Sequence, residues 1–288
     1  MSGSFIVQFL ADRTAPFVLI LGTNEIASAI AVRLKREGYR VVMSHDPFPP
    51  VIRRGMAFYD ALFEDQVEID GMRGRRAGTV LAIAEALADK SVIPVTALQF
   101  SDLLPLRTPD ILIDARIQKR RVTPILRKIV SLSIGLGPNF VAGVNCDIAI
   151  ETHPDHAGEL LEAGATQPAD GVPRFLGGIG RERFIYSARS GIWRTPLDIG
   201  SRIFKGYVIG RLDGLPVAAP MDGRLRGLAR DGLAMQSGVK LVEIDPRGSA
   251  ARWTGTDHTG RTIAEATLRA IYIRIASLQP TPMTMTAH

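Results

Sequence analysis

The feature that most constrains this fold is a strand pattern that runs directly into a glycine turn and a helix pattern. Phe17–Leu21 is a continuous apolar run, as expected for a strand that is buried on both faces. Gly22 follows, and apolar side chains then recur at helical spacing over residues 26–34. Gly38 ends this helix, and residues 40–43 form the next predicted strand. Because a strand, a glycine turn, a helix and a second strand open the dinucleotide-binding folds, we expect an α/β fold with a Rossmann-like, mostly parallel sheet.

Weaker patterns of the same kind continue along the first half of the chain. Residues 77–88 predict a helix, and residues 93–95 and 111–113 predict short strands. Residues 147–151 predict a further strand. Alternating strands and helices favour a parallel sheet, so we assign residues 1–180 to one Rossmann-like domain.

The glycine turn departs from the dinucleotide fingerprint G-x-G-x-x-G/A. Gly22 and Ala27 fit its first and third positions, but Asn24 replaces the second glycine, which normally lets a pyrophosphate approach bare backbone. Glu25 adds a negative charge where an anionic ligand would lie. Asp46, after the second strand, is in a position to bind a ribose hydroxyl or, alternatively, to start a loop turn. The turn therefore favours the fold more than it favours a working dinucleotide site.

The second half of the chain contains an internal repeat with an offset of 32 residues. Three glycines recur at this offset: Gly191, Gly200 and Gly206, then Gly223, Gly232 and Gly238. Such self-similarity indicates two copies of one unit, and short strands with glycine turns suggest a small β-structure in which the copies interlock. The pattern resembles the biotinyl/lipoyl-type barrel-sandwich hybrid, which we place at residues 181–248. Its central hairpin, residues 212–216, has no Lys, so we expect no attached biotin or lipoate. Residues 249–288 predict a C-terminal helix and tail.

The charge and cysteine content exclude several classes of protein. The chain has 35 Lys and Arg against 29 Asp and Glu, a net charge of +6, and both signs are spread evenly along it. A nucleic-acid-binding arm concentrates basic charge, so we expect no nucleic-acid partner. A single Cys excludes a disulfide framework and a Cys-based zinc site. No apolar run approaches the roughly 20 residues of a membrane span and no signal-peptide pattern is seen, so we expect a cytoplasmic protein without a membrane partner.

Several segments, in matching order and spacing, carry a resemblance to one known family. They are residues 51–54, 67–71, 111–116 with Lys119 and Arg120, 135–143, 150–152 with His156, and the repeat up to residue 248. Over residues 18–275 the chain resembles the YqeB-type accessory proteins of selenium-dependent molybdenum hydroxylases, a branch of the XdhC-like maturation factors. The resemblance implies a Rossmann-like domain followed by a hybrid barrel. It also implies that the protein handles a molybdopterin-type cofactor for a client metalloenzyme.

The chain departs from that family at turns expected to line the cleft at the carboxyl ends of the strands. Asn24 and Asn139 stand where family members usually have Gly. His45 stands where they usually have Glu, and Asp147 where they usually have His. We therefore expect a divergent branch with another ligand or another client, and we do not carry selenium dependence over to this chain.

We expect the cofactor-binding residues at the carboxyl edge of the sheet. Arg116 follows a predicted buried strand and is in a position to bind a phosphate through two hydrogen bonds, with Asp114 orienting it; the alternative is a structural ion pair at the strand end. Lys119 extends the positive charge, and Arg53 has either the same role or a place on a solvated loop. The candidates are Gly22, Thr23, Asn24, Asp46, Arg53, Asp114, Arg116, Lys119, Gly135, Gly137 and Asn139.

Other motifs have both a functional and a structural interpretation. The turn of residues 135–139 is either a phosphate-binding turn or a tight exit from a strand. Glu151 and His156 form either an acid–base pair or one end of a metal site, or else they are a helix N-cap and a surface histidine, respectively. Cys146, beside an apolar strand, is interpreted as a buried, inert thiol. No arrangement of nucleophile, base and acid and no metal-ligand spacing stands out.

Three functions follow from these patterns. The leading hypothesis is an accessory or maturation factor that binds a pterin-type or nucleotide-containing cofactor and helps to assemble a molybdenum-hydroxylase-like client. The first alternative is an oxidoreductase that uses NAD(P), which Asn24 and the missing catalytic arrangement weaken. The second is a non-catalytic subunit with a degenerate Rossmann cleft, in which the barrel is an interaction module. A homo-oligomer is left open.

Overall fold

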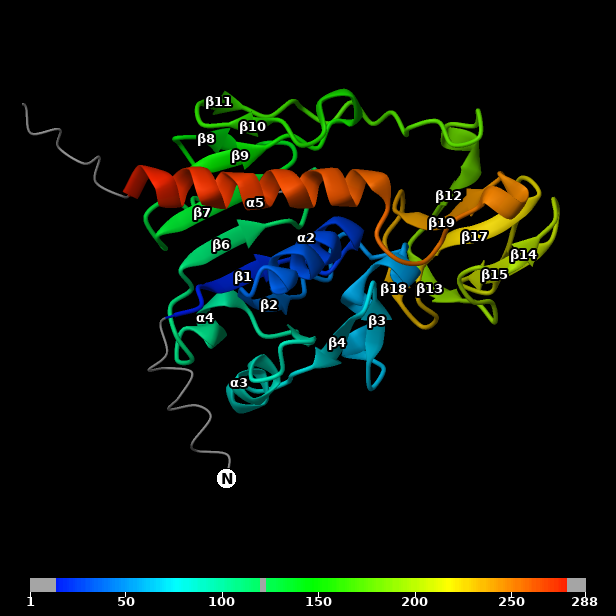
Figure 1. Cartoon of the computed structure of the whole chain (residues 1–288). Helices are drawn as coiled ribbons and strands as arrows, with labels where there is room; N and C mark the ends of the chain where they lie inside the picture. The colour runs from blue at the N-terminus through cyan, green and yellow to red at the C-terminus, as the bar shows by residue number, and fades with distance from the viewer. Residues whose placement is uncertain (1–13, 120–122, 279–288) are drawn as a thin grey trace, which may run out of the picture.

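The computed structural model describes residues 14–119 and 123–278, and its first part is built on one nine-stranded mixed sheet. The strand order is β10-β9-β7-β6-β1-β2-β5-β4-β3 (Figure 1). The central strands run parallel, whereas β3 and β10 pair antiparallel at the two edges. The strands are β1 (Phe17–Leu21), β2 (Arg40–Ser44), β3 (Val67–Ile69), β4 (Met72–Arg76), β5 (Val92–Thr96), β6 (Ile111–Asp114), β7 (Leu132–Leu136), β9 (Ile148–Ile150) and β10 (Leu160–Leu161).

Helices cover both faces of this sheet. Val18 and Ile20 of β1 point into a core that α2 and α5 share, and these two helices pack against each other (Figure 1). Phe17 and Leu19 point the opposite way, into a core with side chains of α3 and α4. Because successive residues of a strand face opposite sides of the sheet, two apolar layers require the continuous apolar run of β1. The helices are α2 (Glu25–Arg36), α3 (Val80–Leu87), α4 (Phe100–Leu103) and α5 (His258–Leu278).

Strands from residue 184 to residue 245 form an all-β unit beside the sheet, called the β-domain below (Figure 1). It has two four-stranded antiparallel sheets, in the orders β12-β19-β17-β14 and β16-β15-β13-β18. β13 pairs with β18 and β14 with β17, so each 32-residue copy exchanges a strand with the other. The strands are β12 (Phe184–Tyr186), β13 (Gly191–Arg194), β14 (Arg202–Ile203), β15 (Val208–Leu212), β16 (Leu215–Ala218), β17 (Gly223–Leu228), β18 (Ala234–Met235) and β19 (Lys240–Asp245).

The core of the β-domain surrounds one aromatic side chain. Trp193 is fully buried, and its Nε1 donates a hydrogen bond to the carbonyl oxygen of Ala229 over 3.1 Å. Apolar side chains from both sheets pack around it. The remaining short elements are β8 (Val141–Ala142), which pairs with β11 (Gly164–Ala165), and the 3₁₀ turns Arg54–Met56, Phe58–Leu62, Pro154–His156, Arg181–Arg183 and Gly248–Ala250.

The predicted combination of a Rossmann-like sheet and a biotinyl/lipoyl-like barrel is wrong. The structure has a larger, mixed sheet with antiparallel strands at both edges, and separate antiparallel sheets follow it. The sequence patterns missed β3, β4 and β10 because apolar runs were used to find strands. β4 has the sequence Met-Arg-Gly-Arg-Arg, in which only Gly74 is buried, and β10 contains only two residues.

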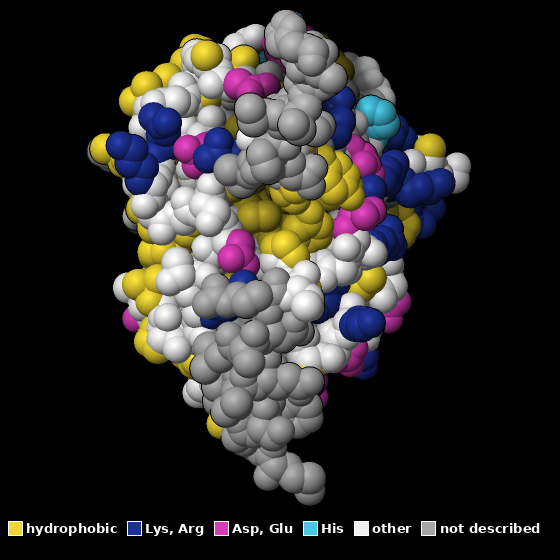
Figure 2. Space-filling model, turned by 60° about the vertical axis from the view of Figure 1, so that its left-hand side comes forward, with side chains coloured by type: hydrophobic (Ala, Val, Ile, Leu, Met, Phe, Trp, Pro, Cys, Tyr) yellow, Lys and Arg dark blue, Asp and Glu magenta, His cyan; other side chains and the backbone are white. Residues whose placement is uncertain are grey.

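The surface carries no field of a single sign on the face seen in Figure 2. Hydrophobic side chains gather near the centre of this view, and basic and acidic side chains lie around them. Within residues 14–119 and 123–278, no helix is long and apolar enough to cross a membrane.

Candidate functional site

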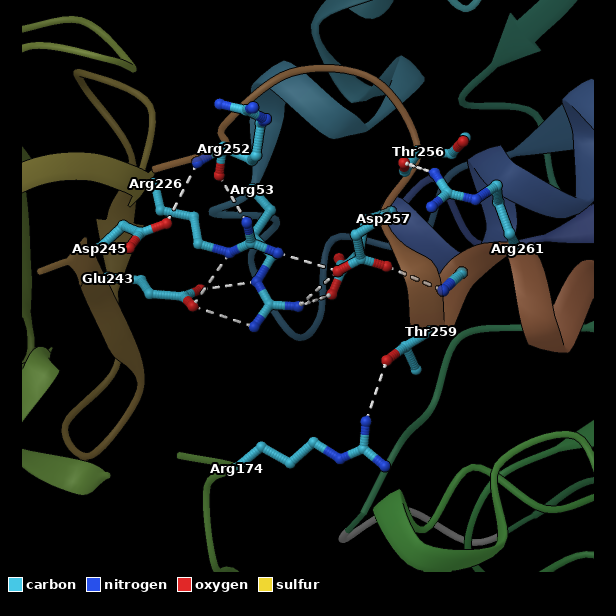
Figure 3. A network of polar contacts seen from close by, with 12 residues as sticks. Arg53, Arg174, Arg226, Glu243, Asp245, Arg252, Thr256, Asp257, Thr259 and Arg261 are labelled. Carbon is cyan, nitrogen blue, oxygen red and sulfur yellow. Dashed lines mark hydrogen bonds and ion pairs between the residues drawn. The ribbon is translucent and has the colours of Figure 1, made fainter. Parts of the chain in front are cut away.

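A network of ion pairs joins the sheet, the β-domain and the start of α5 (Figure 3). Glu243 of β19 is fully buried and accepts hydrogen bonds from Arg53 Nε over 2.6 Å and from Arg53 Nη2 over 3.1 Å. Arg183 also donates to this carboxylate, and Arg226 Nε lies 3.4 Å from its Oε1. Asp257, just before α5, accepts from Arg226 Nη2 over 2.9 Å. We call this the junction network.

The pKa of Glu243 and the contacts of Arg53 show how the charges of the junction network are paired. Burial alone would raise the pKa of Glu243, but the charge of Arg53, followed by those of Arg183 and Arg226, lowers it to about 2. Arg53 also donates to Glu25, at the start of α2, over 3.0 Å. Arg53 is therefore neither a residue of a solvated loop nor a free anion ligand, because its guanidinium is shared between two carboxylates.

The backbone N–H groups at the turn after Gly22 are hydrogen-bonded within the protein. The Asn24 side-chain oxygen caps α2 by accepting from the backbone N–H groups of Ile26 and Ala27, both over 3.0 Å. The Asn24 Nδ2 donates to the carbonyl oxygen of Ala115 over 2.7 Å, and a Cβ on Gly22, where φ is +112°, would lie 3.0 Å from the same oxygen. The N–H groups that would receive a pyrophosphate are thus occupied by the side chain that replaced the second glycine.

Arg116 and Asp114 form the ion pair that was the alternative interpretation. Arg116 Nη2 and Nε donate to the two oxygens of Asp114 over 2.6 Å and 3.0 Å, and Asp114 is almost fully buried. Arg116 Nη1 also lies 3.4 Å from Asp46 Oδ2. Burial works against the charge on Arg116, but the hydrogen bonds and charges of the two carboxylates raise its pKa. The guanidinium that was predicted to bind a phosphate is therefore bound by the carboxylate of Asp114, at the end of β6.

The turn after β7 has the geometry of a tight strand exit. A Cβ on Gly135 would overlap the ring of Phe140, and a Cβ on Gly137, where φ is +86°, would lie 2.9 Å from Thr152 Oγ1. Asn139 has φ +75°, and its carbonyl oxygen accepts from Asn145 over 3.0 Å. These residues are small or turn-forming because the neighbouring side chains leave no space, and none of these contacts requires a phosphate.

Lys119 lies exposed after β6. Its predicted basic neighbours Arg120 and Arg121 lie outside the described residues.

A pocket of about 250 Å³ lies beside Arg116, at the carboxyl edge of the sheet. Its polar lining residues are Ser44, His45, Asp46, Gln99 and Arg116. The other lining residues are mostly apolar and include Leu21, Phe100, Leu112, Ile125, Leu126 and Ile129. They come from strands β1, β2 and β6, from α4 and from the loop of residues 124–129. The pocket therefore combines an apolar lining with several hydrogen-bonding side chains.

His45 is a pocket residue that the sequence singled out only as a departure from the family. Its Nδ1 lies 2.8 Å from the hydroxyl oxygen of the buried Thr23, and its ring centroid is 5.2 Å from that of Tyr59. Burial lowers the pKa of His45, against a smaller opposing effect of the Asp46 charge. The imidazole is therefore neutral near pH 7 and has both a donor and an acceptor nitrogen. The signal in the sequence is a histidine directly after a buried strand.

The remaining candidates have structural roles. Glu151 is buried and accepts from the backbone N–H groups of Thr152 and His153 over 2.6 Å, whereas His156 is exposed beside Glu159. They form no acid–base pair. Burial raises the pKa of the Cys146 thiol to about 12, as expected for an inert cysteine. In the described part of the chain, no group of His, Cys, Asp and Glu side chains is arranged to hold a metal ion.

The chain is related in sequence to one curated protein over most of its length. It is 34% identical over 255 residues to the uncharacterized protein YqeB of Escherichia coli (strain K12), a match that covers 88% of this chain and 47% of that protein. The chain thus spans about half the length of its relative. The match supports membership of the YqeB family, and the relative's name records no XdhC-like role. No family model matches the chain.

Solved structures resemble the chain only distantly. The apo form of the ectoine utilization protein EutE (DoeB) from Ruegeria pomeroyi is 14% identical, with 80% of this chain and 86% of that chain covered and a TM-score of 0.26. An aspartoacylase family protein from Mesorhizobium loti is 14% identical, with 83% and 87% covered and a TM-score of 0.24. A succinylglutamate desuccinylase from Silicibacter is 13% identical, with 81% and 85% covered and a TM-score of 0.24. At these TM-scores the likeness carries no inference about activity.

The geometry of the predicted site corrects the predicted functions. The turn at Asn24 is capped, and Arg53 and Arg116 are bound to carboxylates, so these residues do not present the free anion-binding groups that the predicted cofactor site requires. The maturation factor and the NAD(P)-dependent oxidoreductase both require that cofactor site, and we retain neither of them.

Proposed function

We propose that the chain binds a small organic molecule in the pocket at the carboxyl edge of the sheet. The ligand has an apolar body and an uncharged or cationic head that donates hydrogen bonds. One observation carries the proposal: a largely apolar pocket has the Asp46 carboxylate among its lining residues, and its only lining guanidinium among the described residues, that of Arg116, is already bound to Asp114 through two hydrogen bonds.

The size of the pocket limits the ligand. Sites for drug-sized molecules have volumes of roughly 300–1,000 Å³, and this pocket has about 250 Å³. It suits a single ring with a short polar substituent. The ring would contact the apolar side chains of Phe100, Leu112 and Ile125, where burial of apolar surface supplies most of the binding free energy.

The charged side chains that line the pocket favour a head group that is not anionic. Asp46 accepts from the Phe48 N–H and from Gln118 Nε2, both over 2.9 Å, and its Oδ2 lies 3.4 Å from Arg116 Nη1. Because Asp114 binds the same guanidinium, two carboxylates here share one cation, and the excess negative charge favours a donor or cationic head. An anionic head would instead meet this carboxylate without an uncommitted Arg116 to balance it. The neutral His45 supplies a second hydrogen-bonding group.

Three single-ring compounds of nearly equal shape test the proposal. Benzamide carries a neutral donor head, benzamidine a cationic one and benzoate an anionic one. Binding is measured by saturation-transfer NMR titration with the full chain. We expect benzamide and benzamidine to bind and benzoate to bind at least about tenfold more weakly, which corresponds to about 1.4 kcal/mol. Equal or tighter binding of benzoate would contradict the proposal.

Matched variants test whether benzamidine binds in the pocket. Ile125, at the pocket wall, is 70% exposed, and Val144, which does not line it, is 64% exposed. Ile125→Trp should fill the pocket and abolish benzamidine binding, whereas Val144→Trp should leave it unchanged. Asp46→Asn should reduce the preference for benzamidine over benzoate. Unchanged binding in Ile125→Trp would place the site elsewhere.

A further inference from the structure

The hydrogen bond between Thr23 and His45 fixes the tautomer of a histidine that lines the pocket. Thr23 is 2% exposed, and its Oγ1 lies 2.8 Å from His45 Nδ1. Within residues 14–119 and 123–278, the Thr23 hydroxyl has no other hydrogen-bond acceptor. If Nδ1 carried the proton, it would donate to Oγ1, and the hydroxyl hydrogen would be buried without an acceptor, which costs free energy. The hydroxyl therefore donates to Nδ1, and the imidazole proton is on Nε2.

This tautomer leaves one hydrogen-bond donor of His45 for a ligand. In the described part of the chain, Nδ1 is the only ring nitrogen of His45 that has a hydrogen-bond partner. The ring packs against Tyr59, and the histidine is only partly buried and lines the pocket. Burial lowers its pKa, so the imidazole is neutral near pH 7. The Nε2–H group is thus the donor that His45 offers to the pocket.

Asp46, the next residue along the chain, lines the same pocket and has the opposite hydrogen-bonding character. Its carboxylate accepts hydrogen bonds and shares the Arg116 guanidinium with Asp114. Because the pocket has a volume of only about 250 Å³, one small head group is within reach of both His45 and Asp46. A head group that satisfies both residues carries a hydrogen-bond acceptor beside a donor.

We propose that the head group bound in this pocket is a carboxamide or a cyclic amide, in which a carbonyl oxygen stands beside an N–H group. His45 Nε2–H donates to the carbonyl oxygen, and the Asp46 carboxylate accepts from the N–H group. An amidinium or ammonium head offers donors only, so it leaves the His45 donor without a partner and loses binding free energy. This inference rests on the ligand pocket proposed above and names the class of ligand that it takes.

The tautomer of His45 is measured without any ligand. Long-range proton–nitrogen correlation spectra of the isotope-labelled full chain distinguish a protonated Nε2 from a protonated Nδ1, and the His45 signals are those that His45→Phe lacks. We expect a protonated Nε2 in the wild type. Thr23→Val keeps the shape of the side chain and removes the hydroxyl, so it should raise the population that is protonated at Nδ1. A wild-type His45 that is protonated mainly at Nδ1 would overturn the proposal.

Two probes of nearly equal shape measure the choice of head group. Benzamide carries a donor and an acceptor, whereas benzamidine carries donors only, and both are titrated by saturation-transfer NMR. The loss of one neutral hydrogen bond weakens binding about 3- to 10-fold, so His45→Phe should do this to benzamide. The same variant should change the affinity for benzamidine by less than about twofold, which also shows that it is folded. His156→Phe replaces an exposed histidine that does not line the pocket and should leave both affinities unchanged.

The outcomes separate the class of ligand from the existence of the pocket. If both probes bind the wild type and His45→Phe weakens them equally or not at all, the assignment of an amide head is overturned while the pocket proposal stands. The assignment is also overturned if His156→Phe weakens benzamide as much as His45→Phe does. If neither probe binds the wild type, the pocket proposal fails and this inference fails with it.

Discussion

Replacing Glu243 with Gln tests whether the junction network stabilises the fold. The carboxylate is fully buried, accepts hydrogen bonds from Arg53 and Arg183, and lies 3.4 Å from Arg226 Nε. Burial would raise its pKa, but these three cations lower it from 4.5 to about 2. Such a lowering corresponds to about 3 kcal/mol of favourable interaction between the ionised carboxylate and its surroundings.

Glu243→Gln keeps the shape of the side chain and leaves three guanidinium groups around a neutral amide. Removing one partner of a buried ion pair costs about 3–5 kcal/mol, so we expect the free energy of unfolding at pH 7 to fall by about 3–4 kcal/mol. Urea denaturation followed by tryptophan fluorescence measures this, because Trp193 lies in the β-domain core and Trp253 lies near the junction. Glu68→Gln, at an exposed position of β3, is the matched control and should change it by less than about 0.5 kcal/mol.

The pH dependence gives a second measurement on the same pair of proteins. Because the folded-state pKa of Glu243 lies below 4.5, its contribution is complete above pH 4.5 and is lost as the pH falls towards 2. The stability difference between wild type and Glu243→Gln should therefore shrink by more than half between about pH 5 and about pH 3. A loss below about 1 kcal/mol at pH 7, or a difference that does not change with pH, would refute the assignment of this stability to the ionised carboxylate.

Three further substitutions and one labelling experiment test individual residues. Asn24→Ala should lower the free energy of unfolding by about 1–2 kcal/mol because it removes the cap of α2; an unchanged urea midpoint would contradict this. Arg116→Ala should lower the melting temperature and cost about 1–3 kcal/mol because it leaves the Asp114 carboxylate buried without its main partner, and a variant as stable as wild type would argue against that pairing. Lys240→Met should raise the free energy of unfolding at pH 7 by about 1–2 kcal/mol, because the folded-state pKa of about 8 lies below 10.5, and the gain should disappear as the pH rises from 8 to 10.5. Cys146 should react with a thiol reagent at pH 8 far more slowly in the folded protein than in urea, and equal rates would show an accessible thiol.

The elements that the sequence predicts well are those whose signal is local. The apolar run of β1 and the helical spacing of α2 lie within one short stretch, and each pattern has a single period. β4 shows the opposite case. Its Gly74 packs against the ring of Phe58, and Arg75 and Arg76 are exposed, so its place in the sheet depends on a neighbour and not on its own pattern.

The candidate site was less predictable because its geometry depends on distant partners. Arg53 and Glu243 are separated by 190 positions in sequence, and no local pattern relates them. Arg116 and Asp114 are two positions apart, and their pairing could be considered from the sequence, although it could not be distinguished from a phosphate fork. The same guanidinium and the same strand end serve both interpretations, and only the position of the carboxylate decides between them.

The folded structure shows which basic side chains are paired with carboxylates, and the sequence alone does not. From the sequence, Arg53, Arg116 and Lys119 all belong to one positive edge, and all three were candidates for an anion site. In the structure the two arginines lie against carboxylates, so their charges are compensated before any ligand arrives. Lys119 interacts with the Asp170 carboxylate and helps to lower its pKa, and the Lys240 ammonium group lies 4.1 Å from the centroid of the Phe184 ring. The positive edge that the sequence predicts is therefore largely balanced by carboxylates that folding places beside these cations, and the sequence alone does not show this balance.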